Sequence, residues 1–425
     1  MTSPGDMHRG PLLRLYLGLS YLFPLIASRL LRKRLARGKE DATRWPEKLG
    51  KGLAPRPEGR LIWLHAVGLG EVLSLRGLIA GLAARDADLS FLVTSTTRAS
   101  AQVFTANLPP RTIHQFLPLD APTYRKRFLD HFQPDLCVWA EQDLWPGFVS
   151  DIAARDIPQA LIAARMNERS FQQHDRAQSL YRDLYRAMAL LTAQDTGTAA
   201  HISALSDSTA EVTGSLKPAA PALQHDAAET DALKALLADR FIWAVAPSHA
   251  ADETHALAAH TQLRQTHPDA LLIIAPRFPE RGAAIAGSID DPVPMRSRAE
   301  QPSPQDPIWL CDTFGDLGMI YRLSQAVLIG GTFDDTEGHN PWEAAALHTA
   351  ILHGPRIGNF TTDYAQLGQA KGAIAVSDAD ALAQALIGPD LDTTAQNALT
   401  ATKAAGAQTN QLCSALLRLM DKTHG

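Results

Sequence analysis

The sequence predicts an α/β protein built from two doubly wound domains in series, each around a parallel sheet. Two observations carry this prediction. Short apolar runs alternate with segments of helical periodicity in two successive sets, and a stretch rich in Pro and Ala, residues 217–230, separates the sets. The length of 425 residues agrees, because a single hydrophobic core stops growing near 250–300 residues. Strands buried on both faces are expected to be continuously apolar, as these runs are.

The candidate strands come in two groups. The first group comprises residues 61–66, 91–95, 136–140 and 160–163, with helical patterns at 72–85 and 122–131. The second comprises residues 241–246, 271–275, 308–311, 326–330 and 350–353, with helical patterns at 252–266 and 316–323. A closing helix is expected at 395–422. Because ligands of such sheets bind at the carboxyl ends of the strands, we expect the two halves to face one cleft.

The charge of the chain is unevenly distributed. Residues 1–39 contain eight basic residues and one acidic residue, a net charge of +7 that leaves −12 on the rest, since the whole chain carries −5. Residues 12–31 are an apolar run about 20 residues long, enough as a helix to match a hydrocarbon core. The basic run 32–34 follows it and favours a cytoplasmic body. We expect a membrane-associated helix, either spanning the membrane or lying on its surface; an amphipathic helix packed on the body is the alternative.

Composition excludes several classes of protein. With 45% hydrophobic and 20% charged residues, the chain is neither disordered nor polytopic. Its three cysteines are far apart and form no CxxC pair, so a reducing compartment is expected. Nucleic acid is an unlikely partner, because the body is acidic and the basic cluster adjoins an apolar run. The predicted domains are 1–40 (membrane-associated helix), 41–218 and 219–394 (the two α/β domains) and 395–425 (closing helix).

Two acids follow strands of the first half. The turn after residues 61–66 contains Gly68 and Gly70, which let the backbone approach a ligand, although no third glycine completes a dinucleotide fingerprint. Glu71 falls in the first turn of the next helix. It either complements the helix dipole or stands at the strand end to take a proton from a hydroxyl. Glu141, directly after the strand at 136–140, is the second candidate site acid.

The second half offers groups for an anion. Pro276-Arg277 closes a buried strand, and Arg suits bidentate contacts with phosphate or carboxylate, although a surface-loop role is equally open. Asn340-Pro341, after the Gly330-Gly331 turn, is expected to open a helix whose N-terminus binds an anion. Glu343 either caps that helix or accepts hydrogen bonds from ribose hydroxyls.

Metal and hydrolase chemistry lack support in the sequence. His249 and His339 are candidate ligands, but no second ligand stands at metal spacing and no HExxH or CxxC motif occurs. We therefore expect neither a metal nor a cofactor. The G-x-S-x-G turn of serine hydrolases is also missing.

Several of these segments together resemble one family, the 3-deoxy-D-manno-oct-2-ulosonic acid (Kdo) transferases of lipopolysaccharide synthesis. The ordered set covers about residues 10–370. Its segments are Arg44 to Gly50, Leu61 to Ala66 with Gly70-Glu71, Glu141 to Pro146, Ala164 to Ser170, Val212 to Gly214 with Leu216-Lys217, Ser248-His249 with Glu253, Pro276 to Arg281, Asp312 to Leu317 and Gly338 to Glu343.

The resemblance implies a metal-independent, inverting GT-B glycosyltransferase. Its donor is expected to be CMP-Kdo and its acceptor a lipid A precursor, lipid IVA, at the cytoplasmic face of the inner membrane. Glu71 matches the general base of the family, and Gly70 and Glu141 match the acceptor side. The nucleotide is expected at six residues: Pro276, Arg277, Gly315, Asn340, Pro341 and Glu343.

The chain departs from the family pattern at three places. Gly68 stands where the family usually has Ser, 215–218 replaces an N-L-K-F/Y run, and 356–358 replaces a stretch that often contains His. The departure at Gly68 is the main motive for one alternative, a GT-B paralogue with another donor or acceptor. A second alternative is a non-catalytic membrane-bound GT-B scaffold. The scaffold is disfavoured because the chain keeps Glu71, Arg277 and Glu343, residues from both halves of a site.

Overall fold

The computed structural model describes residues 7–106, 108–238, 240–388 and 390–421. The chain forms two compact units. The first runs to Ala220 and also takes in the chain from Ala405 onward, and the second comprises Pro221–Ala404. The boundary lies two residues after the expected one. The closing helix is no separate segment, since its residues divide between the units. That the two units face one cleft stays a prediction.

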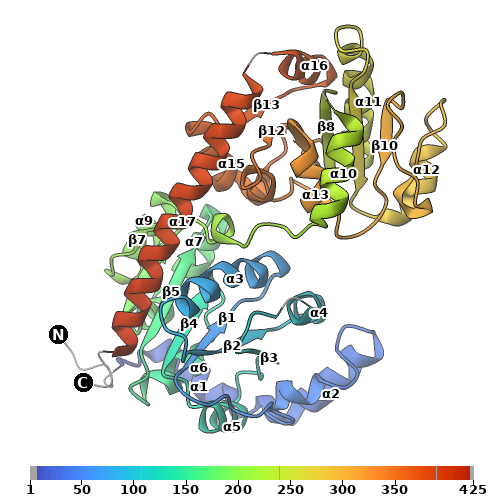
Figure 1. Ribbon diagram of the computed structural model, residues 1–425. Helices are drawn as coiled ribbons and strands as arrows, with labels where there is room; N and C mark the ends of the chain where they lie inside the picture. The colour runs from blue at the N-terminus through green and yellow to red at the C-terminus, as the bar shows by residue number, and fades with distance from the viewer. Residues whose placement is uncertain (1–6, 107, 239, 389, 422–425) are drawn as a thin grey trace. The chain divides into compact units, whose positions relative to one another are not determined.

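The first unit contains a seven-stranded parallel sheet with the order β3-β2-β1-β4-β5-β6-β7 (Figure 1). Its strands are β1 (Leu61–His65), β2 (Ser90–Ser95), β3 (Thr112–Phe116), β4 (Leu136–Ala140), β5 (Gln159–Ala164), β6 (Leu190–Ala193) and β7 (Glu211–Val212). Its helices are α1 (Pro11–Ser20), α2 (Phe23–Ala36), α3 (Leu69–Ala83), α4 (Arg98–Ala106), α5 (Pro122–Phe132), α6 (Pro146–Ala153), α7 (Glu168–Asp175), α8 (Gln178–Arg186) and α9 (Thr196–Ser206).

The second unit contains a six-stranded parallel sheet with the order β10-β9-β8-β11-β12-β13. Its strands are β8 (Ile242–Ser248), β9 (Leu271–Pro276), β10 (Ile308–Leu310), β11 (Ala326–Ile329), β12 (Ala350–His353) and β13 (Ala373–Ala375). Its helices are α10 (Ala227–Leu237), α11 (Ala250–Leu263), α12 (Gly282–Ala286), α13 (Leu317–Leu323), α14 (Trp342–Ala345), α15 (Thr361–Gln369) and α16 (Ala379–Ile387). The long helix α17 (Leu391–Asp421) begins in this unit and ends in the first.

Each sheet is covered by helices on both faces, which explains the continuously apolar strands. In the first unit, side chains of α3 and the end of α17 pack on one face, while those of α5, α6, α8 and α9 pack on the other. In the second unit, α10, α13 and α15 share one cluster with the sheet. The helices α11 and α16 cover the opposite face and lie side by side in Figure 1. Both sheets are doubly wound, and the strand order reverses once in each. The reversal lies between β1 and β4 in the first sheet and between β8 and β11 in the second.

All nine predicted strands are present, and the structure adds β3, β6, β7 and β13. Three of these added strands are sheet edges. β3 contains His and Gln, and β7 and β13 have only two and three residues, so a search for apolar runs does not find them. Helix α10 begins at Ala227, inside the stretch predicted as linker, where the Asp226 carboxylate accepts a hydrogen bond from the Glu229 amide.

The N-terminal apolar run forms two helices rather than one. Helices α1 and α2 meet at a bend of 64°. The break follows from Pro24, which cannot donate to the carbonyl of Ser20 and whose ring clashes with it. By length and apolar character, none of the described helices crosses a membrane alone, whereas the bent pair passes the same test.

The two N-terminal helices are buried on one side and exposed on the other. Leu13, Ala27 and Leu31 are buried against the first unit, and the Tyr16 hydroxyl donates to Asp120 Oδ2 at 2.7 Å. The outer side exposes large apolar side chains, of which Leu25 is 76% accessible. We call this set the N-terminal apolar face: Leu12, Leu15, Leu19, Tyr21, Leu22, Leu25, Ile26 and Leu30.

Candidate functional site

The predicted acids of the first unit lie at the place where its strand order reverses. Strands β1 and β4 are neighbours in the sheet. Glu71 lies in the first turn of α3, which follows β1, and Glu141 directly follows β4. Ligands of doubly wound sheets bind in the crevice at this position. The structure therefore brings Glu71 and Glu141 to one edge of the first sheet.

The carboxylate of Glu71 folds back over the turn that precedes it. Glu71 Oε2 accepts a hydrogen bond from the Val67 amide at 3.0 Å, so the residue does support the start of its helix. It remains partly exposed, and a local role therefore does not prevent contact with a substrate. Gly70 is exposed, and a Cβ placed there would meet no atom within 4 Å. The space over this turn is open.

Glu141 has a strained backbone. Its φ of 62° lies in the left-handed region, which a non-glycine residue rarely adopts. Its amide donates to the carbonyl of Ile162 at 3.0 Å, which ties the residue to the end of β5. Strain of this kind is found most often at functional sites, where the surrounding structure holds a side chain in a set direction.

Sequence reasoning missed a buried network beside these acids. His65, at the end of β1, is fully buried; its Nε2 lies 3.1 Å from Asp143 Oδ2 and its Nδ1 lies 2.8 Å from Thr94 Oγ1. Trp145 Nε1 donates to the same Asp143 oxygen at 2.7 Å. Burial disfavours ionised Asp143, but the hydrogen bonds from His65 and Trp145 outweigh it, and the pKa of Asp143 is lowered. The network joins the loop of Glu141 to the end of the strand that precedes Glu71.

The predicted nucleotide residues of the second unit share one edge of its sheet. Pro276 ends β9 and Arg277 follows it, Gly315 follows β10, and the segment from Asn340 to Glu343 follows β11. Strands β9 and β11 flank β8, β10 lies next to β9 at the sheet edge, and all run parallel. The carboxyl ends of parallel strands meet at one edge, so the structure brings these predicted residues to the same side.

Two arginines of this edge have different roles. Arg281 makes a bidentate ion pair with Glu253, in which Nη1 and Nη2 donate to Oε1 and Oε2 at 2.8 and 2.7 Å. Glu253 also accepts a hydrogen bond from Ser248 Oγ. The side chain of Arg277 makes no hydrogen bond or ion pair with any residue that the structure describes; its guanidinium lies 5.4 Å from the centre of the Phe278 ring. Arg277 is therefore available to an anionic ligand, and Arg281 is structural.

The remaining nucleotide candidates are held by local contacts. Gly315 is exposed with a φ of 98°, a conformation that favours glycine. Asn340 Oδ1 accepts from the Trp342 amide at 3.1 Å, and Asn340 Nδ2 donates to Glu343 Oε1 at 3.3 Å. Burial raises the pKa of Glu343, so its ionised form is costly in the protein.

The expected anion-binding helix N-terminus needs correction. A helix does begin after Pro341, but α14 has only four residues, too few for a substantial dipole. The neighbouring helix α11 is longer, but its N-terminus is occupied by the protein itself. Asp252 Oδ2 there accepts from the amides of His249 and Gly331, at 2.9 and 2.7 Å. The expected anion site at the start of α14 therefore lacks the helix dipole on which the prediction relied.

The two histidines considered as metal ligands contact each other. Their Nε2 atoms are 2.9 Å apart, and the rings are stacked with an interplanar angle of 18°. Among the residues described, no group of three or more His, Cys, Asp or Glu side chains is arranged to hold a metal ion.

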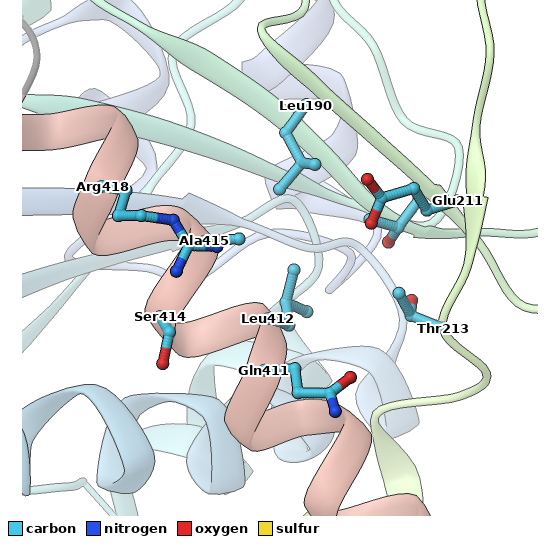
Figure 2. Close-up of a pocket in the computed structure, with 9 residues that line it drawn as sticks. Leu190, Glu211, Thr213, Gln411, Leu412, Ser414, Ala415 and Arg418 are labelled. Atoms are coloured by element: carbon cyan, nitrogen blue, oxygen red, sulfur yellow. The ribbon is translucent and has the colours of Figure 1, made fainter.

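A pocket of about 490 Å³ lies elsewhere in the first unit, between β6, β7 and the end of α17. Figure 2 shows Glu211 and Arg418 on opposite sides of it. None of the predicted site residues lines this pocket.

Comparison with known proteins identifies the family. The profile of 3-deoxy-D-manno-octulosonic-acid transferase (kdotransferase) matches residues 43–220. A relative from Arabidopsis thaliana, described as a probable mitochondrial 3-deoxy-D-manno-octulosonic acid transferase, is 33% identical over 82% of this chain and 80% of its own. The chain belongs to the 3-deoxy-D-manno-octulosonic acid transferase family. A family member from Rickettsia bellii is 29% identical over 87% of this chain and 89% of its own.

Membership in the Kdo transferase family confirms the predicted resemblance and the predicted enzyme class, a glycosyltransferase. The crystal structure of Acinetobacter baumannii MurG is similar to this Kdo transferase family member with a TM-score of 0.52. It is 12% identical and covers 82% of this chain and 99% of its own, so it bears on the fold alone. The predicted GT-B class, with two parallel-sheet α/β units, is confirmed.

Proposed function

We propose that this protein transfers Kdo from CMP-Kdo to a lipid A precursor, lipid IVA, with inversion at the anomeric carbon. The observation that carries the proposal is the state of Arg277. In a member of a Kdo transferase family, a guanidinium without an ion-pair partner stands at the strand edge where nucleotides bind in this type of sheet. The partly exposed carboxylate of Glu71 at the corresponding edge of the first unit supplies the matching base.

The first step of the proposed reaction uses the first unit. Glu71 accepts the proton of an acceptor hydroxyl while the hydroxyl oxygen attacks the anomeric carbon of Kdo. Attack from the face opposite the leaving group in a single displacement inverts the configuration. In this proposal the acceptor sugar occupies the open space over Gly70, and Glu141, whose backbone is strained, contacts the acceptor. The network of His65 and Asp143 keeps these loops in place.

The departing nucleotide uses the second unit. The bond between the anomeric carbon and the phosphate oxygen breaks, and the electron pair leaves with CMP. Arg277 stabilises the negative charge that develops on the phosphate. Glu343 accepts hydrogen bonds from the ribose hydroxyls, which offsets the cost of its burial, and Asn340 orients the Glu343 carboxylate. Pro276 directly precedes Arg277, and Gly315 shapes the loop after the neighbouring strand β10.

In this proposal the phosphate charge is met by Arg277 and not by a metal ion. Metal-dependent transfer needs a pair of acids free to bind the ion. The candidate acidic pair of the second unit is Asp334-Asp335, in the loop after β11. Arg356 Nη2 donates to Asp335 Oδ1 at 2.6 Å, and Asp334 Oδ2 lies 3.6 Å from His249 Nδ1. Both acids are thus engaged within the protein.

We propose further that the N-terminal apolar face lies on the anionic cytoplasmic surface of the inner membrane, where a lipid acceptor resides. The inner sides of α1 and α2 are packed on the first unit, through Leu13, Leu31 and the Tyr16–Asp120 hydrogen bond. A membrane span would separate these contacts, whereas surface binding retains them and buries the exposed leucines. The basic residues that flank the face favour an anionic leaflet.

The proposed function is tested with the purified full-length protein, CMP-Kdo generated in situ and lipid IVA in vesicles. We expect CMP release in equal amount to Kdo-modified lipid. A protein that binds neither CMP nor the donor contradicts the proposed donor and leaves a paralogue with another donor. Donor binding without transfer to any lipid A precursor supports the non-catalytic scaffold. Transfer to a different acceptor retains the donor and corrects the acceptor alone.

A further inference from the structure

The histidine pair of the second unit lies where ligands bind in doubly wound sheets. His249 directly follows β8, and His339 lies in the loop after β11. These two strands are neighbours, and the strand order reverses between them. Gly330 allows the two loops to approach, because a Cβ there would lie 1.9 Å from the carbonyl oxygen of Pro247. The fold thus builds the 2.9 Å contact between the two imidazoles at the crevice itself.

Charged groups surround the pair on several elements. Asp334 Oδ2 lies 3.6 Å from His249 Nδ1. Burial opposes ionisation of Asp334, but the hydrogen bonds from Thr336 and the charge of His249 outweigh it, so the pKa of Asp334 is below its ordinary value. On the other side, burial together with His249 and Arg277 lowers the pKa of His339 to about 4. His339 is therefore uncharged at neutral pH, and the pair faces an ionised aspartate.

Both histidines remain partly exposed, and their other neighbours are Asp252, Tyr364 and Phe278. Asp252 of α11 is buried and directs one oxygen to the amides of His249 and Gly331, and burial raises its pKa. The hydroxyl of Tyr364 on α15 donates to the backbone carbonyl of His339 and not to its ring. The Phe278 ring meets the His249 ring edge to face at 6.0 Å.

The ionised aspartate determines how the protons are arranged. A carboxylate beside His249 Nδ1 favours a proton on that nitrogen, and His249 Nε2 is then an acceptor. It receives the Nε2 proton of His339, which leaves His339 Nδ1 as an acceptor. An acceptor repels a phosphate oxygen. One further proton on His339 Nδ1 converts it into a charged donor, and a charged donor binds phosphate strongly.

We propose that His249 and His339 bind the phosphate of the nucleotide, and that the pair takes up a proton from solvent as it does so. This inference rests on the proposed function, because it assigns a ligand group to the same strand edge. The backbone amides of His249 and Gly331 are already bound by Asp252, and α14 is a single turn. Arg277 alone supplies one positive charge, whereas the phosphate of a nucleoside monophosphate carries nearly two negative charges at neutral pH. The protonated pair supplies the second.

The test is calorimetric titration of the full-length protein with CMP and, separately, with cytidine, at pH 6.5 in two buffers of different ionisation enthalpy. The variants are His339→Asn and His249→Asn, with His225→Asn, an exposed histidine of the same unit, as the matched control. We expect His339→Asn to weaken CMP binding about tenfold or more and to leave cytidine binding unchanged. Any proton taken up by the CMP phosphate contributes equally in all variants. The difference in proton uptake between wild type and His339→Asn therefore measures the uptake by the histidine pair.

Each other outcome overturns a different statement. Unchanged CMP affinity and unchanged proton uptake in both His339→Asn and His249→Asn overturn the inference alone. An equal loss for cytidine shows that the pair shapes the nucleoside pocket and does not bind phosphate. In a further titration of the same variants with CMP-Kdo, a loss for CMP-Kdo with no loss for CMP would overturn the phosphate assignment and assign the pair to the carboxylate of the sugar acid. A wild-type protein that binds no CMP overturns the proposed function and this inference with it.

Discussion

The carboxylate of Glu71 lies so close to Gly68 that a side chain at position 68 would displace it. A Cβ on Gly68 would be 2.8 Å from Glu71 Oε1. Gly68 has φ −72° and ψ 156°, an extended conformation open to any residue, so the glycine is needed for space and not for its backbone freedom. The departure from the serine expected here therefore changes how the proposed base is held.

Replacing Gly68 by Ala is expected to lower kcat about fivefold. The end of the Glu71 side chain is flexible and moves aside, but it then loses its hydrogen bond from the Val67 amide, which is worth about 1 kcal/mol. The Kd for CMP is expected to stay unchanged. Gly406→Ala, at a helical position where a Cβ meets no atom within 4 Å, is the control. An unchanged kcat in Gly68→Ala would show that this orientation of Glu71 does not matter for the reaction.

Replacing Glu71 by Gln is expected to reduce kcat by about 10²–10⁴-fold, because the amide cannot accept the proton of the acceptor hydroxyl. The nucleotide residues lie on the other unit, so CMP binding should remain as in the wild type. The rate of Kdo transfer and the calorimetric Kd for CMP measure both effects. Glu211→Gln, at an exposed position outside the predicted site, should behave as wild type. If Glu71→Gln keeps most of the activity, another group is the base.

The sequence predicted the central strands and the residues that follow them, because both are local properties of the chain. Glu71, Glu141 and Arg277 could be singled out simply from their places after apolar runs. The edge strands β3, β7 and β13 were missed because β3 contains polar residues and β7 and β13 are very short. The apolar run at residues 12–31 was predicted as one helix, although Pro24 in its middle is a local signal for the break that the structure shows.

Contacts between distant residues could not be predicted in this way. His65 and Asp143 are 78 residues apart, and His249 and His339 are 90 apart, so only the pairing of their strands reveals that they meet. The same limit applies to the anion site. Asn340-Pro341 correctly marked a helix start, but nothing local indicated that α14 ends after one turn. The carboxylate of Asp252 that fills the neighbouring helix N-terminus becomes evident only when the loop of Gly331 packs against it.

Arg277 and Arg281 are expected to respond differently to substitution by Ala. Arg277→Ala should weaken CMP binding at least tenfold and leave the thermal stability unchanged, because its side chain pairs with no described residue. Arg281→Ala leaves the largely buried Glu253 without its partner, which should cost about 2–3 kcal/mol of stability. Thermal unfolding and CMP titration of both variants test the contrast. Equal losses of stability in the two would contradict the assignment of Arg277 to the ligand.

Glu343→Gln is expected to stabilise the free protein at pH 7.5 while it weakens CMP binding. Burial raises the pKa of Glu343 above its unfolded value, so its contribution to stability is present below the unfolded pKa, about 4.3, and is lost as the pH rises through the folded pKa. The amide carries no charge and avoids this loss. The Tm of the variant should therefore exceed that of the wild type at pH 7.5, and the two should converge near pH 4.

The exposed Glu280→Gln variant is the control for the Glu343 experiment, with no expected change of Tm at either pH. A higher Tm for the wild type than for Glu343→Gln at pH 7.5 would mean that the carboxylate stabilises the second unit. Glu343 would then have a structural role as a cap of its own helix, which is the alternative to ribose binding.

The N-terminal apolar face is expected to lose membrane binding when Leu25 and Ile26 are both replaced by Glu. These side chains are 76% and 62% accessible, so the fold should be retained, as circular dichroism can verify. Burying each in a membrane is worth about 1.5–3 kcal/mol, and their loss should weaken binding to anionic vesicles at least tenfold. Leu236→Glu, on α10, is the matched control, since Leu236 is exposed outside this face.

Because basic residues flank the face, wild-type binding to anionic vesicles should also fall with salt, more steeply than binding to neutral ones. Vesicle binding that survives the double substitution would assign the membrane contact to another surface.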